Sequence, residues 1–201
     1  RIGGVDAEGD ESILAFAMHG RMGNDSTSIH LQDAHLTQVL SSDLDSGANY
    51  TIDAFVRFPE FPSIAVPFIL IGDESISIAP SGDDGLIKMN VDGVDYDSDV
   101  ISDTAWHHLA LTTDGSITTL WIDGHSAVTA IGSFDVNGSL LQFGDSASTA
   151  LPIYIDAARL SSIVRYTNTF ITISDLEIDA NTLGHWKFNE GSSDDQTPFT
   201  Y

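Results

Sequence analysis

Short runs of apolar and β-branched residues recur along the chain, separated by clusters of Gly, Asp, Ser and Asn. In residues 50–58, apolar side chains occupy every second position, which places them on one face of an extended strand. The other face carries Asp53 and Arg57 beside Phe55, so we expect it to border a partly wet concave surface. No stretch has the pattern of a long helix.

This pattern predicts a chain built of short strands. The expected strands are residues 13–18, 28–31, 50–58, 68–71, 76–79, 86–91, 94–96, 105–112, 118–122, 125–131, 140–143, 153–160 and 183–189. Many short strands with frequent turn residues are typical of sandwiches and jelly rolls. We therefore predict an all-β fold, a two-sheet antiparallel jelly-roll sandwich.

Residues 104–126 carry the strongest local signal. Two apolar strands are joined at residues 113–116, and Asp123-Gly124 follows the second strand. Asp-Gly between alternating apolar residues predicts a tight hairpin turn, because glycine tolerates the positive φ that such turns require.

This hairpin, with its Trp-His-His-Leu-Ala-Leu and Leu-Trp-Ile-Asp-Gly segments, resembles the central hairpin of laminin-G-like domains of the concanavalin-A jelly-roll superfamily. Residues 49–57 and 154–161 are similar to two further strands of that family, although Ala157 replaces its usual carboxylate. Residues 164–170, Val-Arg-Tyr-Thr-Asn-Thr-Phe, resemble a motif of phage virion proteins and marine bacterial surface proteins. In this superfamily the usual role is to bind or display, and less often to catalyse.

The resemblance indicates one domain over residues 12–191, an N-terminal extension at 1–11 and a C-terminal tail at 192–201. Residues 12–20 and 182–191 are similar to each other, so the later segment either pairs beside the first strand or opens a further domain. The chain begins at Arg1, and we expect a processed, cropped or expressed fragment.

Charge narrows the range of partners. The 201 residues include 30 Asp and Glu against 7 Lys and Arg, a net charge of −23. Such a field repels nucleic acid and anionic lipid, and no apolar run is long enough to span a membrane. We favour a high-salt or marine setting as the cause of this acidic composition, with calcium sites or a basic partner as alternatives.

The resemblance also implies one structural Ca²⁺. Its ligands would be Asp156 and the oxygens of a turn formed by Gly23, Asn24 and Asp25. Carboxylate and carbonyl oxygens are the ligands that calcium prefers. The alternative is that Asp25 is a turn residue and that Asp156 bonds a backbone amide or Arg159.

Sugar binding requires an exposed aromatic ring beside groups that hold hydroxyls. Tyr96, in an Asp-rich turn with Asp92 and Asp95, is the candidate glycan-binding set. We expect Trp106 and Trp121 to fill the core, because tryptophan is highly buried on average.

Catalytic and transition-metal patterns are weak. Residues 175–179, Asp-Leu-Glu-Ile-Asp, alternate acidic and apolar types like a glucanase strand, but their order and position predict a solvated linker strand. No Gly-x-Ser-x-Gly motif or cysteine occurs. His107 and His108 are adjacent in a strand and point to opposite faces, so they cannot chelate one metal; we expect one packed ring and one exposed ring. We therefore assign no catalytic residues and predict that the protein is not an enzyme.

These observations predict a non-catalytic virion surface protein: a capsid decoration, spike or fibre domain that stabilises the shell or attaches to a host glycan. The alternative is a secreted or cell-surface carbohydrate-binding adhesin module, and a glycan hydrolase is a third class. The partners would be other virion proteins or a cell-surface glycan, and a homo-oligomer is left open.

Overall fold

The computed structural model describes residues 19–25, 28–40, 44, 48–134, 136, 138–144, 151–172 and 176–188. Its regular structure is entirely β, as predicted. The strands are β1 (His19–Asp25), β2 (Ser28–Val39), β3 (Tyr50–Arg57), β4 (Val66–Ile71), β5 (Glu74–Ser81), β6 (Asp84–Val91), β7 (Val94–Ile101), β8 (Trp106–Thr113), β9 (Ile117–Ile122), β10 (His125–Ile131), β11 (Leu140–Gly144), β12 (Ile153–Ser161) and β13 (Thr182–Trp186). The predicted strand at 13–18 and the terminal extensions lie outside the described residues.

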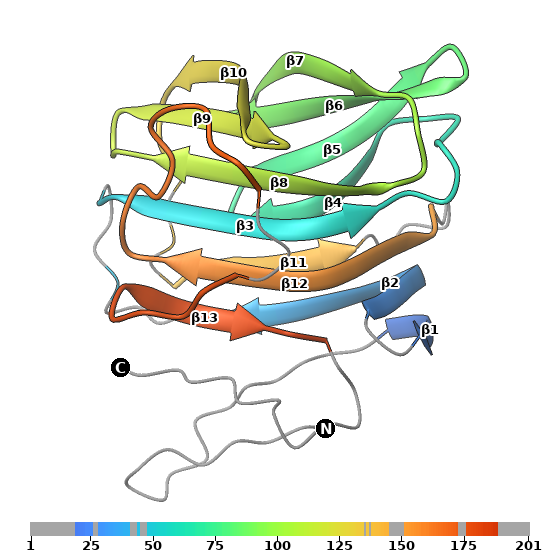
Figure 1. The fold of residues 1–201 in the computed structure, drawn as a ribbon, viewed down its shortest axis with the longest axis horizontal. Helices are drawn as coiled ribbons and strands as arrows, with labels where there is room; N and C mark the ends of the chain where they lie inside the picture. The colour runs from blue at the N-terminus through green and yellow to red at the C-terminus, as the bar shows by residue number, and fades with distance from the viewer. Residues whose placement is uncertain are drawn as a thin grey trace, which may run out of the picture.

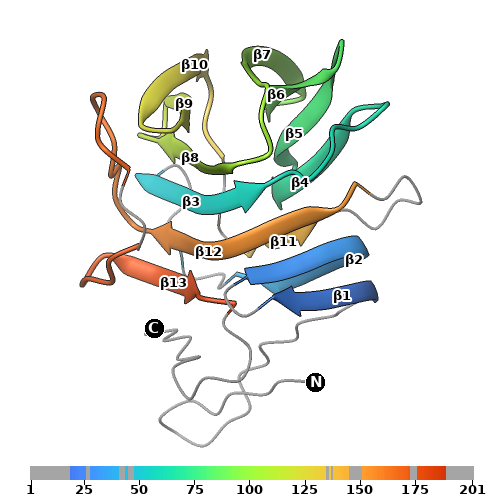
Figure 2. The ribbon, with the colours of Figure 1, turned by 45° about the vertical axis from the view of Figure 1, so that its right-hand side comes forward.

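The strands pair in the order β10-β9-β8-β3-β12-β2-β11-β4-β5-β6-β7, with every pair antiparallel. The long strand β2 joins the two layers, because its first half pairs with β12 and its second half with β11. Figure 2 shows the two layers nearly edge-on, with β8, β9 and β10 facing β5, β6 and β7. This arrangement confirms the predicted jelly-roll sandwich.

The core lies between the layers. On β3 the alternating residues Ile52, Ala54 and Val56 are all buried. Phe58 and Phe68 meet there edge to face, with ring centroids 5.1 Å apart. Each fully buried side chain of this size contributes roughly 1.5–3 kcal/mol, so the alternation seen in the sequence supplies the main stabilisation.

The opposite face of β3 is not the wet surface that we predicted. Thr51 and Asp53 are fully buried there, because the chain between β12 and β13 crosses this face. Figure 1 shows this connection in front of β3, β8 and β9. Thr51 ties it down: its hydroxyl donates to the Ile163 carbonyl at 2.7 Å and accepts from the Arg165 amide at 2.9 Å.

The predicted turn at Asp123-Gly124 is confirmed. Both residues have positive φ, 48° and 81°, as a two-residue hairpin turn of this type requires. Gly124 is needed for a second reason, because a Cβ there would lie 2.0 Å from the Phe170 carbonyl oxygen. The hairpin turn thereby also positions the crossing segment.

One expectation at the sheet edge needs correction. Gly23, Asn24 and Asp25 are the last residues of β1, paired with β2, and do not form a turn. Residues 182–186 form β13, which pairs with β12; residues 12–18 of the segment expected beside it lie outside the described residues, so that pairing stays a prediction. The described residues contain no helix that could cross a membrane.

Candidate binding groove

Residues 162–172, here called the arm, are anchored on the sheet by a buried polar cluster. Arg159 donates from Nε to Asp53 Oδ1 at 3.1 Å and from Nη2 to Oδ2. The Tyr166 hydroxyl donates to Asp53 Oδ2 at 2.6 Å and accepts from Arg159 Nη2 at 3.0 Å. His108 Nε2 lies 3.6 Å from the same carboxylate. Tyr166 of the arm thus contacts Asp53 on β3, His108 on β8 and Arg159 on β12.

The cluster keeps its charges despite burial. Desolvation alone would raise the pKa of Asp53, but hydrogen bonds from His108, Arg159 and Tyr166 outweigh it, so the pKa is lowered. Burial and the neighbouring Asp53 carboxylate raise the pKa of Tyr166. Asp53 is therefore a carboxylate and Tyr166 a neutral phenol that donates to it.

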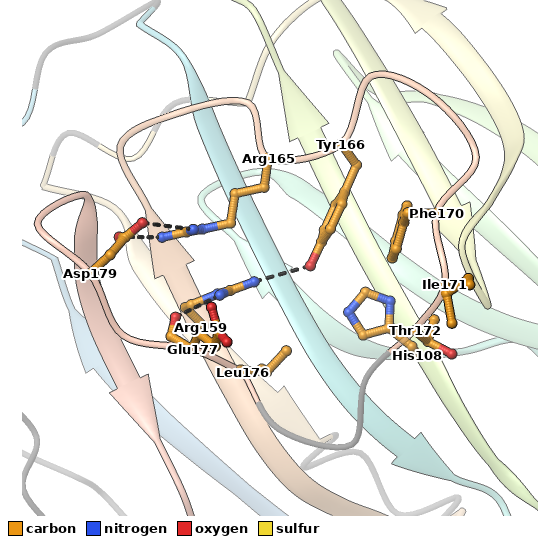
Figure 3. Close-up of a pocket in the computed structure, with 10 residues that line it drawn as sticks. All are labelled: His108, Arg159, Arg165, Tyr166, Phe170, Ile171, Thr172, Leu176, Glu177 and Asp179. Atoms are coloured by element: carbon orange, nitrogen blue, oxygen red, sulfur yellow. Dashed lines mark hydrogen bonds and ion pairs between the residues drawn. The ribbon is translucent and has the colours of Figure 1, made fainter.

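A second tie holds the base of the arm. Arg165 reaches the Asp179 carboxylate at 2.7 and 3.2 Å and donates to Ser161, and its hydrogen bond lowers the pKa of Asp179. Figure 3 shows Arg159 and Arg165 side by side on one wall of a cavity of about 320 Å³. Arg159 Nη1 also donates to the Glu177 carbonyl at 2.7 Å. The arginines of this cavity are thus already paired with protein groups.

The glucanase-like acidic segment does not form the alternating strand. Residues 176–179 have no strand structure, contrary to the predicted linker strand, and Asp175 lies outside the described residues. Asp179 is held by Arg165 and also accepts from the Asn181 amide at 2.9 Å. Its carboxylate is thereby committed to holding the chain.

On the other side of the arm lies an open groove of about 490 Å³, between the arm and the outer face of β8, β9 and β10. Hydroxyl, amide and carboxylate groups predominate among its side chains. The lining residues are Thr112, Asp114, Ile117, Thr119, Trp121, Ser126, Thr129, Val164, Tyr166, Thr167, Asn168 and Thr169.

A row of threonines forms the floor of the groove. Thr112, Thr119 and Thr129 are direct cross-strand neighbours on β8, β9 and β10, so their side chains share one face. The Thr119 and Thr129 hydroxyls are 3.1 Å apart. The Thr112 hydroxyl is buried and donates to the Thr119 carbonyl at 3.3 Å, so it belongs to the floor itself. The Thr119 and Thr129 hydroxyls are more accessible, and each can donate one hydrogen bond and accept others, which is the complement of a sugar hydroxyl.

Aromatic rings support the groove from below. Trp121 is only 5% exposed, as predicted, and its Nε1 donates to Thr112 Oγ1 at 2.9 Å. Tyr166 stacks on Phe170 with centroids 3.9 Å apart, and both rings pack against Trp121. The other predicted core tryptophan, Trp106, is 38% exposed, because it begins β8 at the edge of the molecule. Trp121 therefore braces the arm and presents little ring surface to a ligand.

The predicted glycan residues lie in the other layer, on the β6–β7 hairpin. Asp95 accepts from the Asn90 amide and lies 3.6 Å from Lys88 Nζ. Tyr96, the next residue, points to the opposite face of β7 and packs against the core. Asp92 occupies the turn, with a φ of 53°. Tyr96 and Asp95 thus do not share one surface, and sequence reasoning missed the threonine groove.

The two adjacent histidines point to opposite faces, as predicted, but neither is exposed. His108 joins the cluster around Asp53. His107 is bracketed by carboxylates, with Nδ1 2.7 Å from Asp123 and Nε2 3.2 Å from Asp103. The hydrogen bond to Asp123 raises the pKa of His107 against the effect of burial. The contact between His107 and Asp123 ties the start of β8 to the turn at Asp123-Gly124.

The residues predicted to hold calcium flank β2. Asn24 pairs with Ile29 from one side, and Ile155, beside Asp156, pairs with Ile29 from the other. The donor set, carboxylates and backbone carbonyls, suits calcium. No cluster of three metal-binding side chains occurs among the described residues, and the side chains of residues 23–25 are not among them.

A sequence model of the concanavalin A-like lectin/glucanases superfamily matches residues 26–168, and the chain belongs to this family. This confirms the resemblance seen in the sequence. A search of curated protein sequences found no match.

Three solved structures show the same fold. Domain 4 of AbnA, an extracellular arabinanase from Geobacillus stearothermophilus in complex with arabinotriose, is 16% identical with a TM-score of 0.54, over 73% of this chain and 77% of that one. The binding domain of botulinum neurotoxin DC in complex with SialylT is 11% identical with a TM-score of 0.55, and the match covers 74% of this chain and 42% of that one. The same binding domain with rat synaptotagmin II is also 11% identical, with a TM-score of 0.56 over 74% and 43%. The chain therefore spans less than half the length of the neurotoxin domains, and these identities establish the fold alone.

Proposed function

We propose that this domain is a non-catalytic carbohydrate-binding module and that the threonine groove holds the sugar. The observation that carries the proposal is the pair of accessible hydroxyls, Thr119 and Thr129, that face the polar arm across the groove. A related fold seen with arabinotriose and another with SialylT support it.

The small number of carboxylates in the groove argues against hydrolysis. Most glycoside hydrolases use a pair of carboxylates on either side of the scissile bond. Among the described residues that line the groove, Asp114 is the single carboxylate. Its Oδ1 accepts from the amides of Ser116 and Ile117 at 3.0 and 2.8 Å, which commits that oxygen to shaping the turn.

Titration calorimetry with a panel of oligosaccharides, arabinotriose included, tests the proposal. Thr119→Val keeps the shape of the side chain and removes its hydroxyl, so affinity should fall roughly two- to tenfold, the value of one neutral hydrogen bond. Thr104→Val is the matched control, because Thr104 is exposed outside the groove. Equal affinity of the Thr119 variant and the control would show that the sugar, if bound, lies elsewhere.

We propose further that the module is displayed on a virion, as a decoration, spike or fibre domain that touches a host glycan. The similarity of residues 164–170 to phage virion proteins and the net charge of −23 support this placement. Mass spectrometry of purified particles and of the host envelope tests it. Stoichiometric presence in particles is the expected result, whereas presence on cells alone would identify a secreted or cell-surface adhesin module.

We also propose a structural calcium ion at the start of β2, held by Asp156 and by oxygens of residues 23–25. The placement of β1 and β12 on either side of β2 supports it. The ion would neutralise part of the negative charge there and fix the edge strand β1.

A further inference from the structure

We infer that the threonine groove selects neutral glycans and rejects glycans that carry carboxylate or sulfate groups. The inference rests on the proposed glycan-binding function and adds the class of ligand. Its basis is the placement of charge around the groove.

No basic side chain lines the groove among the described residues. Arg165 is the nearest in sequence, since its neighbours Val164 and Tyr166 both line the groove. Its own side chain lies in the cavity on the other side of the arm, held by Asp179 and Ser161. The arm thus turns its polar residues toward the groove and its cation away from it.

The other described arginines and lysines that have ionic or ring contacts are also engaged away from the groove. Arg159 is buried against Asp53. Lys88 lies on β6, between Asp95 and Asp97. The Arg57 guanidinium lies 4.9 Å from the centre of the Tyr154 ring. None of them could pair with an anionic sugar in the groove without leaving its present contact.

Negative charge, by contrast, is present in the groove and across the protein. Asp114 lines the groove from the turn between β8 and β9, two residues after Thr112, and the whole chain carries a net charge of −23. A sugar carboxylate or sulfate would lose its hydration there and gain no cation, which is costly. A neutral sugar can exchange its hydrogen bonds with water for bonds to threonine and asparagine at little cost.

The test compares matched pairs of oligosaccharides, such as lactose with sialyllactose and a neutral galactan fragment with its sulfated form, by titration calorimetry at low and physiological salt. We expect the neutral member of each pair to bind at least tenfold more tightly, and the difference to shrink as salt screens the charges. Equal or tighter binding of the anionic members overturns the selectivity and leaves the glycan-binding proposal intact. Binding of neither member overturns both.

Asp114→Asn isolates the local charge. The amide oxygen can still accept from the Ser116 and Ile117 amides, so the turn should be kept. Removal of this charge from the groove should improve binding of the anionic member about two- to threefold and leave the neutral member unchanged. Asp83→Asn, in the exposed β5–β6 turn, makes the same change in net charge and should affect neither. Identical behaviour of the two variants would contradict a local role for Asp114.

Discussion

Replacement of Asp53 by asparagine is expected to destabilise the whole domain. Asp53 is fully buried, and its carboxylate accepts from Arg159 Nε, Arg159 Nη2 and the Tyr166 hydroxyl. The variant leaves the Arg159 guanidinium, itself only 5% exposed, without a counter-charge. It also replaces one of the two acceptor oxygens with an NH2 group, which cannot accept from Arg159 or Tyr166.

The expected magnitude follows from the burial of the pair. Breaking a buried ion pair by removing one partner typically costs about 3–5 kcal/mol, because an uncompensated charge is left behind. For a domain of this size each kcal/mol lowers Tm by about 2–4 °C, so the fall should be roughly 6–20 °C. Asp97→Asn is the control, because the exposed Lys88–Asp97 pair at 3.2 Å should be worth at most about 1 kcal/mol.

Urea unfolding followed by tryptophan fluorescence measures both variants, since Trp121 packs against Tyr166 beside the cluster. The double variant Asp53→Asn/Arg159→Met should cost less than the sum of its single variants, because no unpaired charge remains. The reasoning is refuted if Asp53→Asn costs no more than Asp97→Asn, or if the two single effects simply add.

Three further results are expected. Gly124→Ala should lower the free energy of unfolding by about 1–3 kcal/mol from the positive φ alone. It should also weaken glycan binding, because the new Cβ would displace Phe170, and unchanged binding would contradict the role of this turn. The contribution of His107 to stability should be present below its ordinary pKa of 6.5 and be lost as pH rises through its raised pKa, and urea titrations of His107→Gln should lack this loss. Calcium should raise the Tm of the domain, EGTA should reverse that rise, and neither should change the Tm of the Asp156→Asn variant. An equal rise in the variant would exclude Asp156 as a ligand.

Much of the fold could be predicted because strand structure leaves a local signal. Alternation in residues 50–58 and the Asp123-Gly124 turn each depend on neighbours within a few positions. The strand at 19–25 was missed because Gly23, Asn24 and Asp25 are typical turn residues, and only the pairing with β2 makes them a strand.

The site was harder to predict because it depends on contacts between distant residues. Asp53 and Arg159 are 106 positions apart, and the alternating pattern of β3 could not show that the arm would cover its charged face. The threonine row likewise requires the register of three strands, since Thr112, Thr119 and Thr129 have no common spacing. The similarity of residues 164–170 to a known motif was the available signal, but it did not reveal which surface the arm would form.

The most direct test of the glycan-binding groove is an NMR titration of the ¹⁵N-labelled domain with the tightest-binding oligosaccharide of the panel. The account predicts that amide shifts concentrate on Thr119, Thr129 and Asn168, on the two sides of the groove. Shifts confined to the β6–β7 hairpin around Tyr96, or no shifts with any sugar, would contradict it.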